Sequence, residues 1–322
     1  MHSYDVICVG MALVDSIIMG FDPNPVSASG YRAASGSLNV GGEAVNEAMA
    51  AAKLGLKTGI LCSLGEDAAG DMIVSALQRC GVDPEPILRS AAHPTPVTTM
   101  FVREDGTRRS ITNSAHRYNF HPERHTDRFS GARALILGSL FRAPFDDPEI
   151  IHAVLTAAKA EGQLVFADTK LPNFRFLTLE DLRDSLPLID YITPNEDEAR
   201  YYTGREDPAE QAAVFLDHGV RNVLIKLGAR GCYFRNEETA LRMEAFRIDP
   251  VDATGAGDCM LAGFAAALIR GADLTDALRA GSACGAICTT AVGAGTALRD
   301  MAQVRALMDA QPDVAPVEVK KP

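Results

Sequence analysis

Residues 252–258 have the sequence DATGAGD, and the apolar run CMLAGFAAALI follows directly at 259–269. We interpret this stretch as a glycine-rich loop that leads into the N-terminus of a helix. The small residues at 255–257 allow the backbone to approach a ligand closely. The first N–H groups of a helix have no partner within the helix and together carry about +0.5 of an elementary charge. The stretch therefore predicts a binding site for an anion.

Asp258 places a negatively charged carboxylate beside the predicted anion site. Its position makes sense if the anion is a transferring phosphoryl group, because Asp258 would then accept the proton of the attacking hydroxyl. A simpler interpretation is that an acidic residue in the first turn stabilises the helix through its dipole. A single glycine-rich loop does not decide between these interpretations.

A second glycine pair, Gly41 and Gly42, precedes a helical pattern that runs to about residue 54. Like the first loop, this pair allows a ligand to approach the backbone closely. Asn46 and Glu43 fall on one face of the expected helix, near its start. Asn46 is the better candidate for ligand contact, because Glu43 is slightly better explained as a first-turn carboxylate that stabilises the helix dipole.

Composition and charge exclude several classes of protein. A chain of 322 residues, 47% hydrophobic and 23% charged, fits one large α/β domain with an added piece. The net charge of −11 argues against nucleic acid or an anionic membrane as a partner. The sequence has no uninterrupted apolar run of about 18 residues and no basic start, so we expect no membrane span, no signal peptide and a cytoplasmic location. The seven scattered cysteines include no Cys-x-x-Cys pair, which predicts reduced, mostly buried thiols and no zinc site.

The order of the expected elements predicts an α/β fold with a doubly covered, mostly parallel sheet. Residues 4–10 are a short apolar run that ends in glycine, typical of a strand buried on both faces. From about residue 131 strands and helices alternate, beginning with a strand at 132–137 and a helix at 147–161. We expect residues 1–311 to form one domain and residues 312–322 to be a loose tail.

Two segments depart from this alternation and predict a lid. Residues 16–40 lack a helical period, and Asp105-Gly106 lies between β-rich runs at 96–103 and 108–113, which is a strong hairpin signal. We therefore expect a small antiparallel β lid, inserted from about 13–40 and 96–114.

Polar residues stand at the ends of several expected strands. Asp15 follows the first strand, Asp168 follows the strand at 163–167, and Lys226 ends the strand at 222–226. The carboxyl ends of parallel strands share one edge of the sheet, where the loop at 252–258 would also lie. These segments are therefore expected to meet in one crevice.

Two further groups of residues allow both a functional and a structural interpretation. Asn195 and Glu198 suit water-bridged contact with Mg²⁺ or phosphate, but the same spacing describes a helix N-cap with its capping-box partner. Gly228 and Gly231, taken alone, are ordinary turn glycines.

Taken together, these segments resemble the ribokinase-like (phosphofructokinase-B, PfkB) carbohydrate kinase family from residue 4 to about residue 310. The family's two motifs look like GGxxxN at residues 41–46 and DxTGAGD at residues 252–258. Members have a parallel α/β domain with an antiparallel β lid, which often forms a dimer, and they transfer the ATP γ-phosphate to a sugar or nucleoside hydroxyl. The resemblance implies ATP and Mg²⁺ as cofactors, a sugar as substrate and a homodimer through the lid.

The resemblance also implies a role for each candidate residue. The general base would be Asp258, with the amides of Gly255, Ala256 and Gly257 as the anion hole. The substrate would contact Asp15, Gly41, Gly42 and Asn46. The nucleotide would contact Asn195, Lys226, Gly228, Gly231, Gly255 and Gly257. Glu198 would bind Mg²⁺ through water, and Asp252, Thr254 and Gly293 match a loop that holds a monovalent cation such as K⁺ in some members.

A departure from the family pattern and two alternative functions qualify the resemblance. Glu43 stands where ribokinase-type sequences often have Lys, so the resemblance does not imply ribose itself. A nucleoside kinase of the same family and a non-catalytic nucleotide or sugar sensor are the alternatives; a sensor would not need to keep Asp258. A dehydrogenase is disfavoured because Gly10 does not begin a Gly-x-Gly-x-x-Gly turn.

Overall fold

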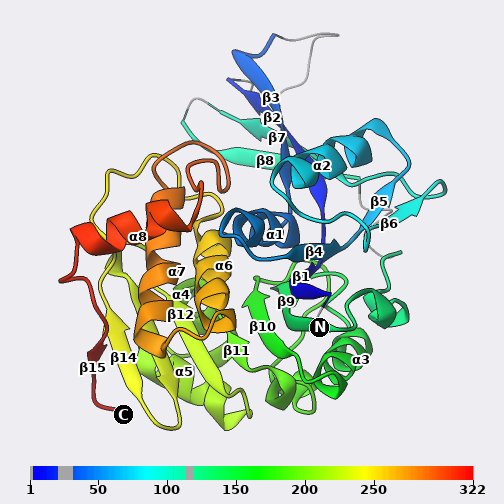
Figure 1. Ribbon diagram of the computed structural model, residues 1–322. Helices are drawn as coiled ribbons and strands as arrows, with labels where there is room; N and C mark the ends of the chain where they lie inside the picture. Colours follow the sequence, from blue (N-terminus) through cyan, green and yellow to red (C-terminus); the bar gives the residue numbers. More distant parts are fainter. Residues whose placement is uncertain (1–2, 21–31, 104, 114–118, 322) are drawn as a thin grey trace.

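The computed structural model describes residues 3–20, 32–103, 105–113 and 119–321. Within these residues a nine-stranded sheet forms the centre of the molecule (Figure 1). In spatial order its strands are β15 (Val317–Glu318), β14 (Ala240–Met243), β13 (Cys232–Asn236), β12 (Asn222–Lys226), β11 (Tyr191–Ile192), β10 (Leu164–Thr169), β9 (Ala132–Leu140), β1 (Tyr4–Val9) and β4 (Thr58–Leu61). The pairs from β12 to β4 are parallel, and β13, β14 and β15 add antiparallel pairs.

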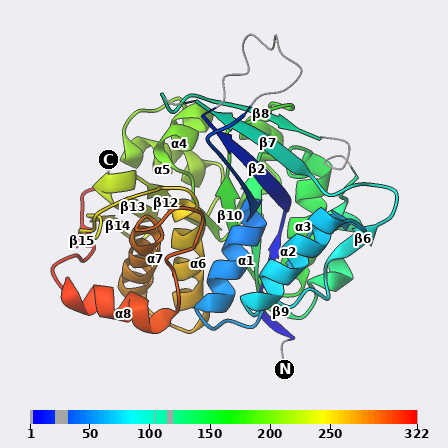
Figure 2. The same ribbon diagram turned by 90° about the horizontal axis from the view of Figure 1, so that it is seen from above.

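Helices cover both faces of this sheet, which explains why β1 and β9 are apolar almost throughout. One face packs against α1 (Glu43–Lys53), α2 (Ala68–Arg79), α6 (Ala256–Ile269), α7 (Leu274–Cys288) and α8 (Met301–Ala310). The other packs against α3 (Pro148–Ala160), α4 (Glu196–Thr203) and α5 (Pro208–Asp217). Figure 2 shows the first group as one row along the sheet. The predicted α/β fold with a doubly covered, mostly parallel sheet is confirmed.

A four-stranded sheet projects from the main body as the predicted lid (Figure 1). Its order is β3 (Ser35–Gly41), β2 (Leu13–Met19), β7 (Val97–Val102) and β8 (Arg108–Thr112). The two outer pairs are antiparallel as expected, but the central pair of β2 with β7 is parallel. A parallel pair needs a long crossover, and the chain from α1 through β5 (Ser63–Gly65) and β6 (Leu88–Ser90) supplies it. Parts of the expected lid, residues 21–31, 104 and 114, lie outside the described residues.

The expectation of a loose tail after residue 311 is wrong for much of that segment. Val314 is buried, and its carbonyl accepts a hydrogen bond from Arg279 Nε at 2.9 Å. Beyond it, β15 pairs with the edge strand β14. Backbone pairing at the edge of a sheet needs no apolar period in the sequence, so the composition of the tail did not predict the strand β15.

One further prediction concerns membranes. Among the described residues, no helix combines the length and the apolar character needed to cross a bilayer.

Candidate active site

The expected loop and helix N-terminus are present where α6 begins. Gly255 precedes the helix with φ 76°, and a Cβ there would lie 2.6 Å from the Ala294 Cβ, so only glycine fits. A Cβ on Gly257 would lie 3.1 Å from Lys226 Nζ, which places that ammonium group at the same helix end. The Ala256 amide donates to the Ala253 carbonyl at 3.2 Å. An anion would therefore rely mainly on the Gly255 and Gly257 amides.

Asp258 lies in the first turn of α6 and is only 6% exposed. Its Oδ2 accepts a hydrogen bond from Asn46 Nδ2 at 2.6 Å. Burial raises the pKa of Asp258 to about 6, and the negative charges of Glu43 and Asp168 act in the same direction, while Lys170 opposes them. A carboxylate with this pKa is mostly ionised at neutral pH yet basic enough to take a proton.

Helix α1 brings Glu43, Asn46 and the unpredicted Glu47 to Asp258. The helix begins after Gly42, whose φ is 102° and whose added Cβ would lie 2.3 Å from the Met11 carbonyl oxygen. This sharp turn directs the first turn of α1 towards α6, consistent with the Asn46–Asp258 hydrogen bond. Asn46 therefore contacts Asp258, the last residue of the DxTGAGD motif, although the two residues are 212 positions apart in the chain.

Glu43 is held by an ion pair and a hydrogen bond. Lys170 Nζ lies 3.0 Å from Glu43 Oε1, and Ser139 Oγ donates to Oε2 at 2.5 Å. Burial favours the neutral acid, but Lys170 and Ser139 outweigh it and lower the pKa of Glu43. Ser139 has φ 69°, a backbone conformation unusual outside glycine, so the chain is constrained where it meets Glu43.

Asp15 lies on the lid strand β2, near Glu43. It is partly buried, and a Cβ on Gly41 would lie 2.6 Å from its Oδ2. Burial raises the pKa of Asp15, and Glu43 contributes further. The structure thus places Asp15 beside Gly41 and near Glu43, while Asn46 contacts Asp258.

Asn195 and Glu198 form the capping box that was one of their two interpretations. Asn195 Oδ1 accepts from the Glu198 amide, and Glu198 Oε2 accepts from the Asn195 amide, both at 2.9 Å. Glu198 Oε2 also accepts from Thr169 Oγ1 at 2.8 Å. A capping role does not exclude ligand contact, because a carboxylate oxygen accepts more than one bond.

Lys226 is the last residue of β12, and its Nζ lies 2.6 Å from Asp168 Oδ1. The strand register shifts around Asp168, between Ala167 and Thr169, an irregularity that re-aims a side chain at the end of β10. Beyond Lys226, Gly231 has φ 83°, and a Cβ there would overlap the Met243 carbonyl, so this glycine is required by its turn. Gly228 has open space around its Cβ position.

The residues matched to a cation loop form a closed turn beside α6. Asp252 Oδ1 accepts from the Thr254 amide and hydroxyl at 3.0 and 2.7 Å. Its Oδ2 accepts from the Gly293 amide at 2.9 Å, which ties residues 252–254 to 293. These bonds lower the pKa of Asp252 although burial opposes them. The Thr254 carbonyl oxygen accepts a hydrogen bond from the Cys288 thiol at 3.4 Å. A thiol is a weak donor, so this oxygen can also bind a cation.

The sequence analysis missed Glu47 and gave Asp168 only a place at the shared edge of the sheet. Glu47 is fully buried, and one carboxylate oxygen each of Glu47, Asp168 and Asp258 lie within 4.8 Å of one another. The signal was available, since Glu43, Asn46 and Glu47 stand at i, i+3 and i+4 and share a helix face.

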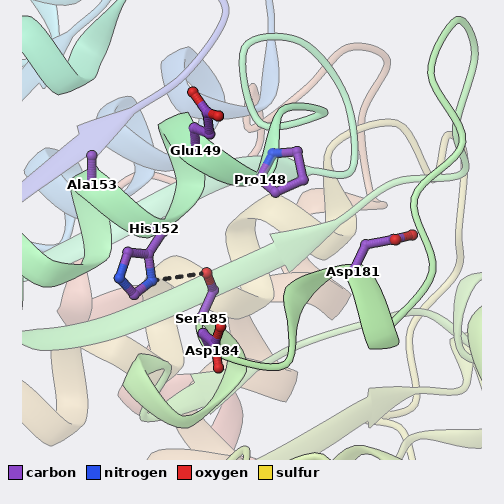
Figure 3. A pocket seen from close by; sticks show the side chains of 7 residues that line it. All are labelled: Pro148, Glu149, His152, Ala153, Asp181, Asp184 and Ser185. Atoms are coloured by element: carbon purple, nitrogen blue, oxygen red, sulfur yellow. Dashed lines mark hydrogen bonds between the residues drawn. The ribbon is translucent and has the colours of Figure 1, made fainter.

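A separate surface pocket of about 340 Å³ lies between α3 and the turns at 180–188 (Figure 3). Its lining comprises Pro148, Glu149, His152, Ala153, Asp181, Asp184 and Ser185. It contains none of the residues around Asp258, so it is not part of the candidate active site.

Comparison with known proteins gives the class of enzyme, a phosphotransferase with an alcohol group as acceptor. Residues 6–301 match the pfkB family carbohydrate kinase, and the chain belongs to this family. The ribokinase of Haemophilus influenzae is 30% identical over 266 residues, covering 80% of this chain and 83% of that protein. A fructokinase of Arabidopsis thaliana (probable fructokinase-4) is 28% identical and covers 83% of this chain and 87% of its own length.

Solved structures support the same assignment. The ribokinase of Arabidopsis thaliana, solved with ribose and ATP, superimposes with a TM-score of 0.85 at 27% identity. The match covers 95% of this chain and 98% of that one. The chain is therefore a carbohydrate kinase of ribokinase-like fold, and ATP binding is implied by its family.

Proposed function

We propose that this protein transfers the γ-phosphate of ATP to a hydroxyl of a monosaccharide or sugar derivative, with Asp258 as general base. The observation that carries the proposal is the buried Asp258 at the start of α6, hydrogen-bonded to Asn46 and with a pKa of about 6. A base with a pKa near the working pH combines the correct ionisation state with proton affinity.

The substrate would be held by Asp15, Gly41, Gly42 and Asn46. Asn46 Oδ1 is buried and has no hydrogen-bond partner among the described residues. A buried amide oxygen without a partner is costly, and a sugar hydroxyl would satisfy it while lying near Asp258. Proton transfer to Asp258 would then accompany attack on the phosphoryl group.

The phosphoryl group would lie over the N-terminus of α6. The Gly255 and Gly257 amides, together with Lys226, would stabilise negative charge on its oxygens. Asn195, Gly228 and Gly231 would contact the nucleotide. Glu198 would hold Mg²⁺ through water, an oxygen ligand of the kind this ion prefers. When bound, Mg²⁺ would neutralise negative charge on the phosphates. Asp252, Thr254 and Gly293 would hold K⁺, which would stabilise the loop that carries the Gly255 and Gly257 amides.

A neutral sugar fits the charges of the substrate side better than a sugar acid or sugar phosphate. Lys170 is already paired with Glu43, and an anionic group on the substrate would face Asp15, Glu43 and Asp258. Like charges within a few ångströms repel strongly where water is excluded.

A panel of neutral sugars, sugar acids, sugar phosphates and nucleosides tests the proposal by ADP formation with Mg-ATP. We expect turnover with a neutral sugar and a loss of about 10²–10⁴-fold in kcat for Asp258→Asn. Asp276→Asn is the matched control, because Asp276 also stands in the first turn of a helix, α7, but is exposed.

Other outcomes would revise specific parts of the proposal. Full activity of Asp258→Asn would remove the general base. Turnover restricted to nucleosides would favour a nucleoside kinase, and ATP binding without turnover of any compound would favour a sensor.

Two proposals concern the whole protein. We propose one kinase domain, which extends past the expected limit at residue 311 because β15 belongs to its sheet, and a homodimer through the lid, supported by the exposed Leu38 and Ile111 on the lid sheet. A cytoplasmic location is supported by the free cysteines, all but one of which are buried.

A further inference from the structure

The substrate side of the candidate active site presents hydrogen-bond acceptors that have no donor. Asp15 on the lid strand β2 is partly buried, and the described residues give its carboxylate no hydrogen bond or ion pair. Asn46 Oδ1 is buried and likewise has no partner in the described part of the chain. A buried acceptor without a donor is unfavourable, so a bound substrate has to bring donors to both groups.

The same side of the site carries an excess of negative charge. Glu43 lies close enough to raise the pKa of both Asp15 and Asp258. Lys170 supplies an ammonium group here, but its Nζ lies 3.0 Å from Glu43 Oε1. The Glu43–Lys170 pair is neutral as a whole, which leaves the charges of Asp15 and Asp258 uncompensated. A cation would stabilise these two carboxylates in their ionised form.

Other cationic side chains around the site are engaged elsewhere. Lys226 pairs with Asp168 at 2.6 Å, on the side assigned to the phosphoryl group. Arg142 Nε donates to the Leu171 carbonyl at 2.7 Å. The pKa of Asp15 is raised by burial first and by Glu43 second, and neither Lys226 nor Arg142 lowers it. The positive charge that Asp15 needs therefore has to come from the ligand.

The supply of donors distinguishes an ammonium group from a hydroxyl as the partner of Asp15. A sugar hydroxyl has one donor and two acceptor lone pairs, whereas an ammonium group has three donors and no acceptor. A hydroxyl bound to Asp15 would need donors for its own lone pairs, and Lys170 already uses one of its N–H bonds on Glu43. An ammonium group satisfies Asp15 and makes no such demand.

We propose that the preferred substrate is an amino sugar, whose protonated amine binds Asp15 while one of its hydroxyl groups lies against Asn46 and Asp258. This inference rests on the proposed kinase reaction and narrows its substrate class. Asp258 stays free to act as the general base, because a different carboxylate, on the lid, binds the amine. Charge-assisted hydrogen bonds are roughly twice as strong as neutral ones, so an amino sugar should bind more tightly than the corresponding neutral sugar.

The test compares amino sugars with parent sugars that carry a hydroxyl in place of the amine. Glucosamine is compared with glucose, galactosamine with galactose and fructosamine with fructose, by calorimetry of the whole protein at neutral pH without ATP. We expect at least one amino sugar to bind about tenfold or more tightly than its parent. With Mg-ATP, the same amino sugar should also have the higher kcat/KM.

Three variants separate the effect of charge from that of shape. Asp15→Asn removes the proposed partner of the amine and should bring the ratio of the two affinities to about one. Glu43→Gln removes a negative charge and frees Lys170, so it should lower the same ratio. Asp276→Asn is the matched control, because Asp276 is exposed on α7, and this variant should keep the wild-type ratio. Thermal unfolding shows which variants are folded, and the wild-type comparison decides by itself if one is not.

The proposal is overturned if the parent sugar binds as tightly as the amino sugar in all three pairs, or if no amino sugar binds at millimolar concentration. An unchanged affinity ratio in folded Asp15→Asn would also overturn it. The kinase reaction is judged separately by ADP formation. Turnover of a neutral sugar with no preference for the amine would leave the proposed function standing and remove only this inference.

Discussion

Asp258 shows how neighbouring side chains give a carboxylate a different chemistry from that of a surface aspartate. Burial is the largest cause of its raised pKa, and Glu43 is the next. Glu43 in turn keeps its charge because Lys170 and Ser139 stabilise the ionised form. The ionisation of the proposed base therefore depends on residues that need not touch the substrate.

At the residue scale, we predict how catalytic rate depends on pH. A general base must be deprotonated, so kcat/KM should fall about tenfold per pH unit below the Asp258 pKa of about 6. In Glu43→Gln a negative neighbour is lost and Lys170 loses its partner, and both changes lower the pKa of Asp258. The acidic limb of the pH–rate profile should then move to lower pH.

The control for this prediction is Glu149→Gln, because Glu149 is exposed on α3 and lines the separate pocket of Figure 3. Its profile should coincide with that of the wild type. An unmoved limb in Glu43→Gln would contradict the coupling between Glu43 and Asp258.

At the scale of elements, the start of α1 depends on Gly42. Its φ of 102° is unfavourable for other residues, and an added Cβ would lie 2.3 Å from the Met11 carbonyl oxygen. We predict that Gly42→Ala lowers the free energy of unfolding by about 1–3 kcal/mol or more. It should also reduce activity, because α1 carries Asn46.

Gly162→Ala separates conformational strain from overlap in this prediction. Gly162 has φ 70°, but no heavy atom lies within 4 Å of its Cβ position. Chemical denaturation should show a smaller loss of stability, of about 1 kcal/mol. Equal losses in both variants would mean that the overlap at Met11 relaxes freely.

At the scale of the whole molecule, the lid has one face towards the active site and one away from it. Leu38, Ser16, Thr99 and Ile111 are cross-strand neighbours in β3, β2, β7 and β8. Side chains alternate along a strand, so this row lies on the face opposite to Asp15. Leu38 is 60% exposed and Ile111 is 69% exposed, which is costly on a free surface and suits a second copy of the lid.

We predict that the double variant Leu38→Asp, Ile111→Asp is a monomer in sedimentation velocity at micromolar concentration, whereas the wild type is a dimer. Charges buried at an apolar interface oppose association. Val317→Asp is the control, because Val317 is 61% exposed but lies on β15 at the far edge of the main sheet. A monomeric wild type would rule out the proposed dimer.

The sequence by itself determined the class of fold and named most of the candidate site residues. Local patterns predicted the alternation of strands and helices, the two glycine motifs and the position of Asp258 at the start of α6. Hydrophobic period, turn residues and helix ends are all local properties of the sequence. The polar residues at strand ends were readable for the same reason, since parallel strands share one edge.

Only the tertiary structure decided which of these residues touch. The sequence placed Glu47 on the helix face of Asn46, but Glu47 becomes a buried neighbour of Asp168 and Asp258 only when α1, β10 and α6 pack together. The parallel pairing of β2 with β7 and the pairing of β15 with β14 likewise join segments far apart in the chain. Contacts of this kind depend on packing and charge across the whole fold, and no local pattern encodes them.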